Sequence, residues 1–131
     1  MTAILLDTNA LLWLVSAPDR VSDRARGILA DQTNELFVSA VSAWELAIKT
    51  RLGRIDADPL LSAWDATVAG LSAVDLPIDS ADAAMAGRLP WEHRDPFDRM
   101  IVAQASRRGL MIATSDRQII AGAMTSVLDT R

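Results

Sequence analysis

Short apolar runs alternate along the chain with amphipathic stretches, and this alternation predicts strands that each lead into a helix. The expected strands are Ala3–Leu6, Leu36–Val38, Ser72–Leu76, Leu110–Ala113 and Ser126–Leu128. The expected helices cover about residues 11–15, 23–31, 40–52, 60–70, 80–88, 96–108 and 116–121. Because parallel strands need crossover helices, this order indicates an α/β fold with a mostly parallel sheet covered by helices on both faces.

The size and composition of the chain narrow its class. Its 131 residues, half of them apolar, predict a single domain spanning residues 1–131 with one hydrophobic core. No apolar run approaches the roughly 18 residues of a membrane span. The first residues lack the basic lead of a secretory signal and there is no cysteine, so a cytoplasmic location is expected. The net charge of −4 is unusual for a protein that coats nucleic acid, but it does not exclude a metal-dependent nuclease.

Two aspartates stand where an expected strand meets a helix. Asp7 directly follows the strand Ala3–Leu6, and Asp116 follows the strand Leu110–Ala113 after two residues. Each can be explained as the N-cap of the following helix, a role that Asp often fills. In a parallel sheet, however, ligand sites also form at this edge, where strands end and helices begin. Both interpretations remain open for either residue alone.

Two further acids lie on expected helices. Asp98 belongs to the first turn of a helix that Asp95 caps and Pro96 begins, where the helix dipole favours a carboxylate. Yet Asp98 shares a helix face with Ile101 and Val102, and an ionised group on a face that packs against the sheet needs a cation nearby.

Glu45 has two simpler explanations: a capping box with Ser42, and a helical ion pair with Lys49. It also shares a face with Ile48 and Leu52, which indicates that its side chain points inward.

A shared cation explains why all four acids fall near strand-to-helix junctions. Oxygen ligands without cysteine or a histidine cluster suit Mg²⁺, with Mn²⁺ as a substitute, and such a site can activate water and stabilise charge on a phosphodiester. The chain has no glycine-rich phosphate loop of either common type. Its one histidine, His93, is expected to be a solvated loop residue. A response-regulator receiver would need a lysine at a late strand end, whereas the only lysine is Lys49, on a helix.

Four motifs together resemble the PIN-domain toxins called VapC. They are LLDTNALL at residues 5–12, WELAIK at 44–49, DPFDRMIVAQA at 95–105 and TSD at 114–116. Each motif alone is weakly specific, but their order and spacing match across nearly the whole chain. The resemblance implies a three-layer α/β/α domain with a five-stranded, mostly parallel sheet. It also implies an acidic pocket at the carboxyl edge of that sheet and a magnesium-dependent endoribonuclease.

The matching motifs place the family's acids on Asp7, Glu45, Asp98 and Asp116. Asp7 and Asp98 are expected to bind the metal directly, and Glu45 and Asp116 through metal-bound waters. Asn9 is expected to orient the Asp7 carboxylate from outside the metal's own ligand set, and Asp95 to serve mainly as a helix cap.

The resemblance also implies an RNA substrate, a cognate VapB-like antitoxin and a homodimer. Of the arginines, Arg94 and Arg99 are expected to contact substrate phosphate, because both flank the acidic motif. The antitoxin is expected to lay apolar side chains near Trp44 and Trp64 and to direct an arginine at the acids. One alternative is a catalytically silent PIN fold that binds RNA or protein; another is a DNA nuclease or phosphatase using the same metal site.

Overall fold

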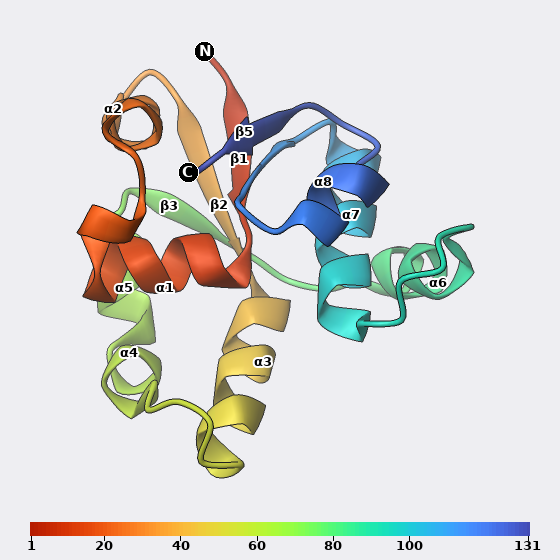
Figure 1. Ribbon diagram of the computed structural model, residues 1–131, viewed down its shortest axis with the longest axis horizontal. Helices are drawn as coiled ribbons and strands as arrows, with labels where there is room; N and C mark the ends of the chain where they lie inside the picture. Colours follow the sequence, from red (N-terminus) through yellow and green to blue (C-terminus); the bar gives the residue numbers. More distant parts are fainter.

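Five parallel strands form one sheet in the order β3-β2-β1-β4-β5 in the computed structural model, which describes residues 1–131 (Figure 1). The strands are β1 (Ala3–Leu6), β2 (Glu35–Ser39), β3 (Ala73–Leu76), β4 (Met111–Thr114) and β5 (Val127–Asp129). In register, Leu6 of β1 pairs with Val38 of β2 on one side and Ala113 of β4 on the other. The carboxyl ends of these three central strands therefore lie side by side at one edge.

Helices cover both faces of the sheet. They are α1 (Thr8–Ser16), the short 3₁₀ helix η1 (Pro18–Arg20), α2 (Asp23–Ala30), α3 (Ala40–Arg51), α4 (Asp58–Ser62), α5 (Trp64–Gly70), α6 (Ser80–Arg88), α7 (Pro96–Arg108) and α8 (Arg117–Gly122). In Figure 1, α1 and α2 lie to one side of the sheet, and α6, α7 and α8 to the other. The predicted three-layer α/β/α architecture is confirmed.

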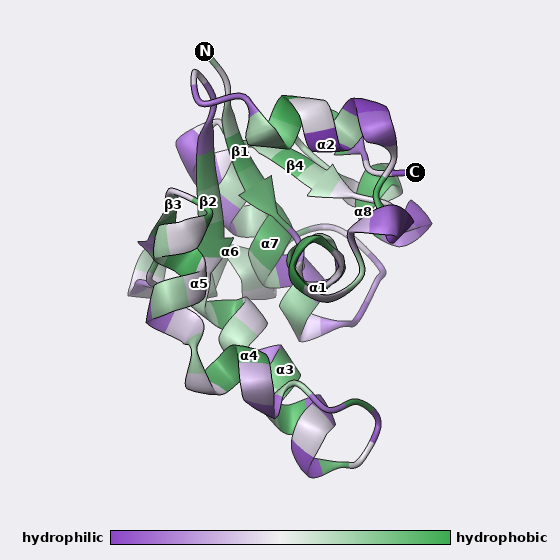
Figure 2. Ribbon diagram, turned by 90° about the vertical axis from the view of Figure 1, so that its left-hand side faces the viewer, coloured by the Kyte–Doolittle hydropathy of each residue, from purple (hydrophilic) through white to green (hydrophobic).

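Alternate residues of the central strand supply two separate cores. Leu5 packs with Ile101 of α7 in one cluster, whereas Ile4 and Leu6 pack with Leu11 of α1 in the other. All of these side chains are at most 1% exposed, and complete burial of such a side chain stabilises the fold by about 1.5–3 kcal/mol. Strands β1 and β2 are hydrophobic along most of their length (Figure 2), as expected for a parallel sheet that is buried on both faces.

Several predicted boundaries differ from the structure, and three of these differences follow from the local backbone or a helix cap. The first helix begins at Thr8 rather than Leu11, because Asp7 caps it by accepting a hydrogen bond from the amide of Ala10. The helix expected over 60–70 is two helices, α4 and α5, separated at Ala63 with φ −111°. β3 begins at Ala73 because Ser72 adopts the left-handed conformation, with φ 51°, which no strand residue adopts.

Helices α3, α4 and α5 extend the molecule beyond the carboxyl edge of the sheet (Figure 1). A third, small core of Leu46, Ala57 and Leu60 joins α3 to α4. Trp64 packs against this core and against the cluster on the α1 side of the sheet. None of the helices is both long and apolar enough to cross a membrane.

Candidate active site

Four carboxylates converge beyond the carboxyl ends of β1, β2 and β4. Asp7 and Asp116 cap α1 and α8, Glu45 lies in the second turn of α3, and Asp98 lies in the first turn of α7. A polar pocket of about 80 Å³ is lined by these four residues together with Thr8, Asn9, Lys49 and Asp95. All four acids named from the sequence therefore meet in one place, and no apolar residue lines that pocket.

Asp7 is the most deeply placed acid of the pocket. It is 3% exposed; its Oδ1 accepts a hydrogen bond from the amide of Ala10 at 2.7 Å, and its Oδ2 accepts one from the hydroxyl of Thr114 at 2.5 Å. Burial raises the pKa of Asp7 to about 6, although both hydrogen bonds oppose the shift. The residue is thus a helix cap and a desolvated carboxylate at once, so the two interpretations of Asp7 are compatible.

Thr114, rather than Asn9, holds the Asp7 carboxylate. Asn9 lines the pocket but makes no hydrogen bond to Asp7, so the orienting role expected of it is corrected. Leu6 pairs with Ala113 in the sheet, which places the residues that follow them, Asp7 and Thr114, side by side. The hydroxyl of Thr114 also accepts a hydrogen bond from the amide of Asp116 at 3.0 Å. One threonine therefore links two of the four acids.

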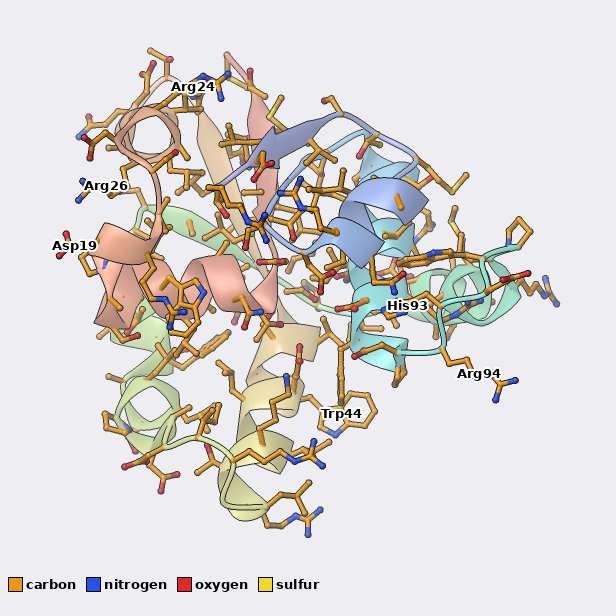
Figure 3. The ribbon with its side chains drawn as sticks, viewed as in Figure 1. Asp19, Arg24, Arg26, Trp44, His93 and Arg94 are labelled. Carbon is orange, nitrogen blue, oxygen red and sulfur yellow. The ribbon has the colours of Figure 1, made fainter.

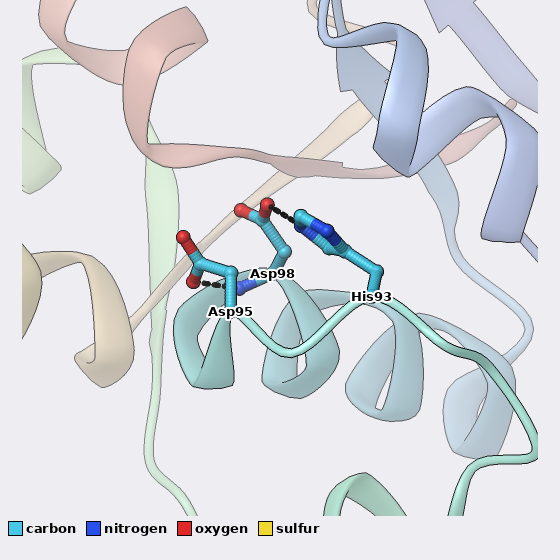
Figure 4. Close-up of side chains that lie close together, drawn as sticks. All are labelled: His93, Asp95 and Asp98. Carbon is cyan, nitrogen blue, oxygen red and sulfur yellow. Dashed lines mark hydrogen bonds and ion pairs between the residues drawn. The ribbon is translucent and has the colours of Figure 1, made fainter.

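Asp98 faces a histidine and a second aspartate (Figure 4). Its Oδ2 is 2.7 Å from Nε2 of His93, and its side chain is 15% exposed. Burial raises the pKa of Asp98 to about 6; the bond to His93 lowers it, and the charge of Asp95 raises it further. Asp95 caps α7 by accepting hydrogen bonds from the amides of Phe97 and Asp98, as the sequence predicts.

The expectation that His93 is a solvated loop residue is wrong. Its side chain is 20% exposed and lies against Asp98. His93, Asp95 and Asp98 can present ligand atoms within 4.8 Å of one another. The only sequence signal for this contact is the five-residue spacing from His93 to Asp98 across the start of a helix, which is weak without the course of the loop.

Glu45 is 6% exposed and pairs with Lys49 one helical turn later, at 2.5 Å from Oε2 to Nζ. The predicted ion pair is therefore present. The capping box with Ser42 is wrong, because α3 begins earlier and Ser39 caps it through the amide of Val41. Ser42 instead exchanges a hydrogen bond with Thr8, which ties the start of α3 to the start of α1 beneath the pocket.

Neither arginine expected at the substrate contacts the pocket acids. Arg94 is exposed on the loop before α7 and points away from the pocket (Figure 3). Arg99 uses all five of its N–H groups on backbone carbonyls, those of Ala86, Gly87, Leu89, Trp91 and His93. It has no donor left for a phosphate, so the prediction of a phosphate contact from Arg99 is corrected to a structural role.

The pocket has more negative than positive charge. Five carboxylates line it or its rim, and among the basic side chains only Lys49 and His93 contact any of them. Buried like-charged carboxylates with raised pKa values bind a cation readily, because a cation relieves both the desolvation and the repulsion. The donor set is almost entirely oxygen, which fits a hard divalent cation such as Mg²⁺ or Mn²⁺. His93 is the one nitrogen donor close by.

Comparisons with known proteins agree with this geometry. The chain is 34% identical over 121 residues to Ribonuclease VapC22 of Mycobacterium tuberculosis (strain ATCC 25618 / H37Rv), which covers 91% of each protein. A chain in the crystal structure of VapBC2 from Rickettsia felis bound to a promoter DNA fragment superimposes with a TM-score of 0.73 at 13% identity, over 99% of this chain and 100% of that one. A chain in DNA-bound VapBC from Salmonella typhimurium gives 0.70 at 20% identity, with complete coverage of both.

At such low identity the two structures show a shared fold only. The family model described as PIN domain matches residues 4–123, which include all four pocket acids. With this match, and a relative 34% identical over nine tenths of the chain, the protein belongs to the PIN-domain family.

Proposed function

We propose that the protein is a metal-dependent endoribonuclease, the toxin of a type II toxin–antitoxin pair. One observation carries the proposal: Asp7, Glu45, Asp98 and Asp116 converge in one pocket, and burial raises the pKa of both Asp7 and Asp98 to about 6. A fold needs no such cluster for stability, because repelling buried carboxylates destabilise it. The 34% identical relative is named a ribonuclease, and chains of VapBC complexes have the same fold.

Each acid has a distinct part in holding the cation. Asp7 and Asp98, whose carboxylates are fixed by Thr114 and His93, would bind the ion directly, and Glu45 and Asp116 would bind it through water. Mg²⁺ is the expected ion, with Mn²⁺ as a substitute. Bound there, the ion supplies Lewis acidity for activation of water and stabilisation of the phosphate oxygens. Lys49, which lines the pocket, can contact an RNA phosphate there, whereas the exposed Arg94 can contact RNA only outside the pocket.

A catalytically silent PIN fold that binds RNA or protein is the second candidate. The burial of Asp7 and Glu45 argues against it, since burying carboxylates costs free energy and a module that only binds RNA or protein gains nothing from it. A DNA nuclease or a phosphatase with the same metal site predicts the same pocket and differs only in substrate. Activity assays on RNA, DNA and phosphomonoesters distinguish the three.

The deciding experiment uses the purified chain freed of any partner. RNA cleavage is expected with Mg²⁺ or Mn²⁺ and not in excess EDTA. Asp7→Asn and Asp98→Asn should each lower the rate more than about 100-fold, because losing a ligand costs more than losing an outer partner of a metal site, which costs about 10- to 100-fold. Asp31→Asn is the matched control, with the same charge change in an exposed residue outside the pocket. Cleavage that persists in excess EDTA would show that the reaction does not need a metal ion.

We further propose that a VapB-like antitoxin neutralises the protein in the cytoplasm. Trp44 supports a partner surface beside the pocket, since its side chain is 56% exposed while its ring packs edge-on against Phe97. Trp64, expected to share that surface, packs instead against two cores. An antitoxin arginine directed at the four acids would replace the cation, so raising Mg²⁺ should relieve inhibition of cleavage. Inhibition that is indifferent to Mg²⁺ would place the partner elsewhere.

We also propose that the protein forms a homodimer. Half of its residues are apolar, and some apolar side chains are exposed, so a second copy can cover them. Light scattering across micromolar concentrations is the test. A monomer mass throughout would contradict it.

A further inference from the structure

The loop between α6 and α7, residues 89–95, contains no helix or strand, but side-chain contacts anchor it at several points. Arg99 of α7 binds its carbonyls at Leu89, Trp91 and His93 and two more at the end of α6, at distances from 2.7 to 3.3 Å. A guanidinium with all five donors committed fixes a backbone at several points at once. Arg99 directly follows Asp98, so the loop is anchored to the same helical turn that carries this pocket acid.

A close packing contact fixes the middle of the loop as well. Trp91 lies against Gly122 at the end of α8, where a Cβ atom on the glycine would come within 2.3 Å of the indole ring. Only glycine fits this approach. The indole is also tilted against the His93 ring, with centroids 4.9 Å apart. The loop is therefore held between α7 and α8, the two helices whose first turns carry or adjoin Asp98 and Asp116.

The loop contacts the pocket through one hydrogen bond, between His93 and Asp98. An ionised carboxylate can only accept, so His93 donates through Nε2 to Oδ2 of Asp98, at 2.7 Å (Figure 4). Oδ1 of Asp98 makes no hydrogen bond within the chain and stays available to the pocket. A histidine that does this fixes which carboxylate oxygen faces a ligand, and at what angle.

We propose that residues 89–95 form a positioning arm whose function is to hold His93 against Asp98, so that the Asp98 carboxylate is oriented for a divalent cation before the cation binds. His93 is a positioning residue, and Arg99, Trp91 and Gly122 act by fixing the arm. The proposal rests on the metal site of the proposed function and adds to it the device that orders one ligand. Partners that orient ligands in this way contribute about 10- to 100-fold in metal affinity.

The test is the affinity of the purified chain for Mg²⁺, and separately for Mn²⁺, measured by titration calorimetry without RNA. His93→Gln and His93→Met are a matched pair, because the two side chains are similar in length and flexibility and only Gln can donate a hydrogen bond. His93→Met is expected to weaken binding about 10- to 100-fold, and His93→Gln to recover most of that loss. A purely structural role for His93 would make no distinction between the two variants.

A second pair probes the arm at a distance from the acids. Gly122→Ala displaces Trp91, and we expect it to weaken Mg²⁺ binding about three- to tenfold, less than the direct loss of the His93 bond. Gly27→Ala in α2 is the control, since nothing lies within 4 Å of its Cβ position, and it should bind like the unaltered chain. Thermal unfolding of each variant verifies that it is folded.

The outcomes separate this inference from the proposed function. If the unaltered chain binds the cation and folded His93→Met binds it equally well, the arm does not position Asp98 and only this inference is overturned. If His93→Met does not fold, equal affinity of Gly122→Ala and Gly27→Ala overturns the inference in the same way. If the unaltered chain binds neither cation, the metal site fails and the arm with it.

Discussion

The protein buries acidic side chains in two places, and the two are built in opposite ways. At the α6–α7 contact, Asp82 is fully buried and accepts hydrogen bonds from Arg107, Arg108 and Gln104. Burial alone would raise the pKa of Asp82, but the bonds from Arg108, Gln104 and Arg107 outweigh it and hold that pKa well below its usual range. This acid is ionised because two arginines compensate it.

Asp7 and Asp98 in the pocket have no arginine or lysine partner of this kind. Asp7 is buried almost as deeply as Asp82, yet its partners are a hydroxyl and an amide, and its pKa is raised to about 6. Asp98 has a histidine and a second carboxylate as neighbours, with the same result. Burial of an acid therefore does not distinguish a structural residue from a functional one. The count of cations within hydrogen-bonding distance does, because an uncompensated carboxylate is retained at a cost that only a ligand offsets.

The largest effect is expected from removing the charge of Asp82. Asp82→Asn leaves two arginines facing a neutral amide, and loss of a buried partner destabilises a fold by about 3–5 kcal/mol. Arg107 and Arg108 are 33% and 25% exposed, so water partly solvates their charges. The free energy of unfolding, measured with urea, is therefore expected to fall by about 2–4 kcal/mol. Asp79→Asn is the control: Asp79 binds Arg107 too but is 56% exposed, so a much smaller loss of stability is expected. Equal losses for both variants would contradict the comparison.

Much of the fold and the acids of the pocket could be predicted, because their signals are local. The strand before Asp7 and the helix that Asp95 and Pro96 begin are each indicated by a few consecutive residues, and α7 spans the predicted residues 96–108. In a parallel sheet, acids that follow different strands must meet at one edge, so Asp7 and Asp116 could be brought together without knowing any side-chain contact.

The partners of these acids could not be predicted, because each contact joins distant parts of the chain. Thr114 is 107 residues from Asp7, and register in the sheet brings them together, which made Asn9 the nearer but wrong choice. Arg99 lies beside the acidic motif in sequence, yet the course of a loop decides where its side chain points. The compensated cluster around Asp82 was missed for the same reason, since its arginines are 25 and 26 residues away.

Lowering the pH should weaken metal binding in the pocket but leave Asp82 and its arginine partners ionised. With pKa values of about 6, Asp7 and Asp98 are mostly ionised at pH 7 and mostly protonated at pH 5, while Asp82 stays ionised at both. Because the cation binds only the ionised form, Mg²⁺ affinity should fall about tenfold per carboxylate, about 100-fold in all, between pH 7 and pH 5. Calorimetric titration at the two pH values measures the Mg²⁺ affinity, and circular dichroism verifies that the protein stays folded. Affinity that is constant over this range would show that the two acids are not ligands.

Neutralising Asp7 should stabilise the metal-free protein. The folded state raises the pKa of Asp7 from 3.8 to about 6, so it binds the proton more tightly than the unfolded chain does, and stability falls as pH rises through that window. Above it, the ionised form costs about 3 kcal/mol at about 1.4 kcal/mol per pKa unit. Asp7→Asn removes that cost, and a gain of about 1–3 kcal/mol is expected near pH 8 in EDTA. The gain should vanish near pH 4, where Asp7 is protonated; a gain that does not depend on pH would have another cause.

The smallest effect is expected from removing the lysine partner of Glu45. Glu45 is the one pocket acid with such a partner, so its charge is partly compensated, between the cases of Asp7 and Asp82. The ammonium of Lys49 lies 2.5 Å from Oε2 of Glu45 and lines the pocket, where it repels a cation and occupies one carboxylate oxygen. Lys49 is 34% exposed, so solvent screens it, and Lys49→Gln should raise Mg²⁺ affinity only about two- to fivefold at low salt and less at high salt. Arg51→Gln, an equal charge change on an exposed residue of the same helix, should leave affinity unchanged. A fall in affinity for Lys49→Gln would instead mean that the lysine orders Glu45 for the ion, as His93 is proposed to order Asp98. Glu45 would then count as a positioned ligand rather than a partly compensated one.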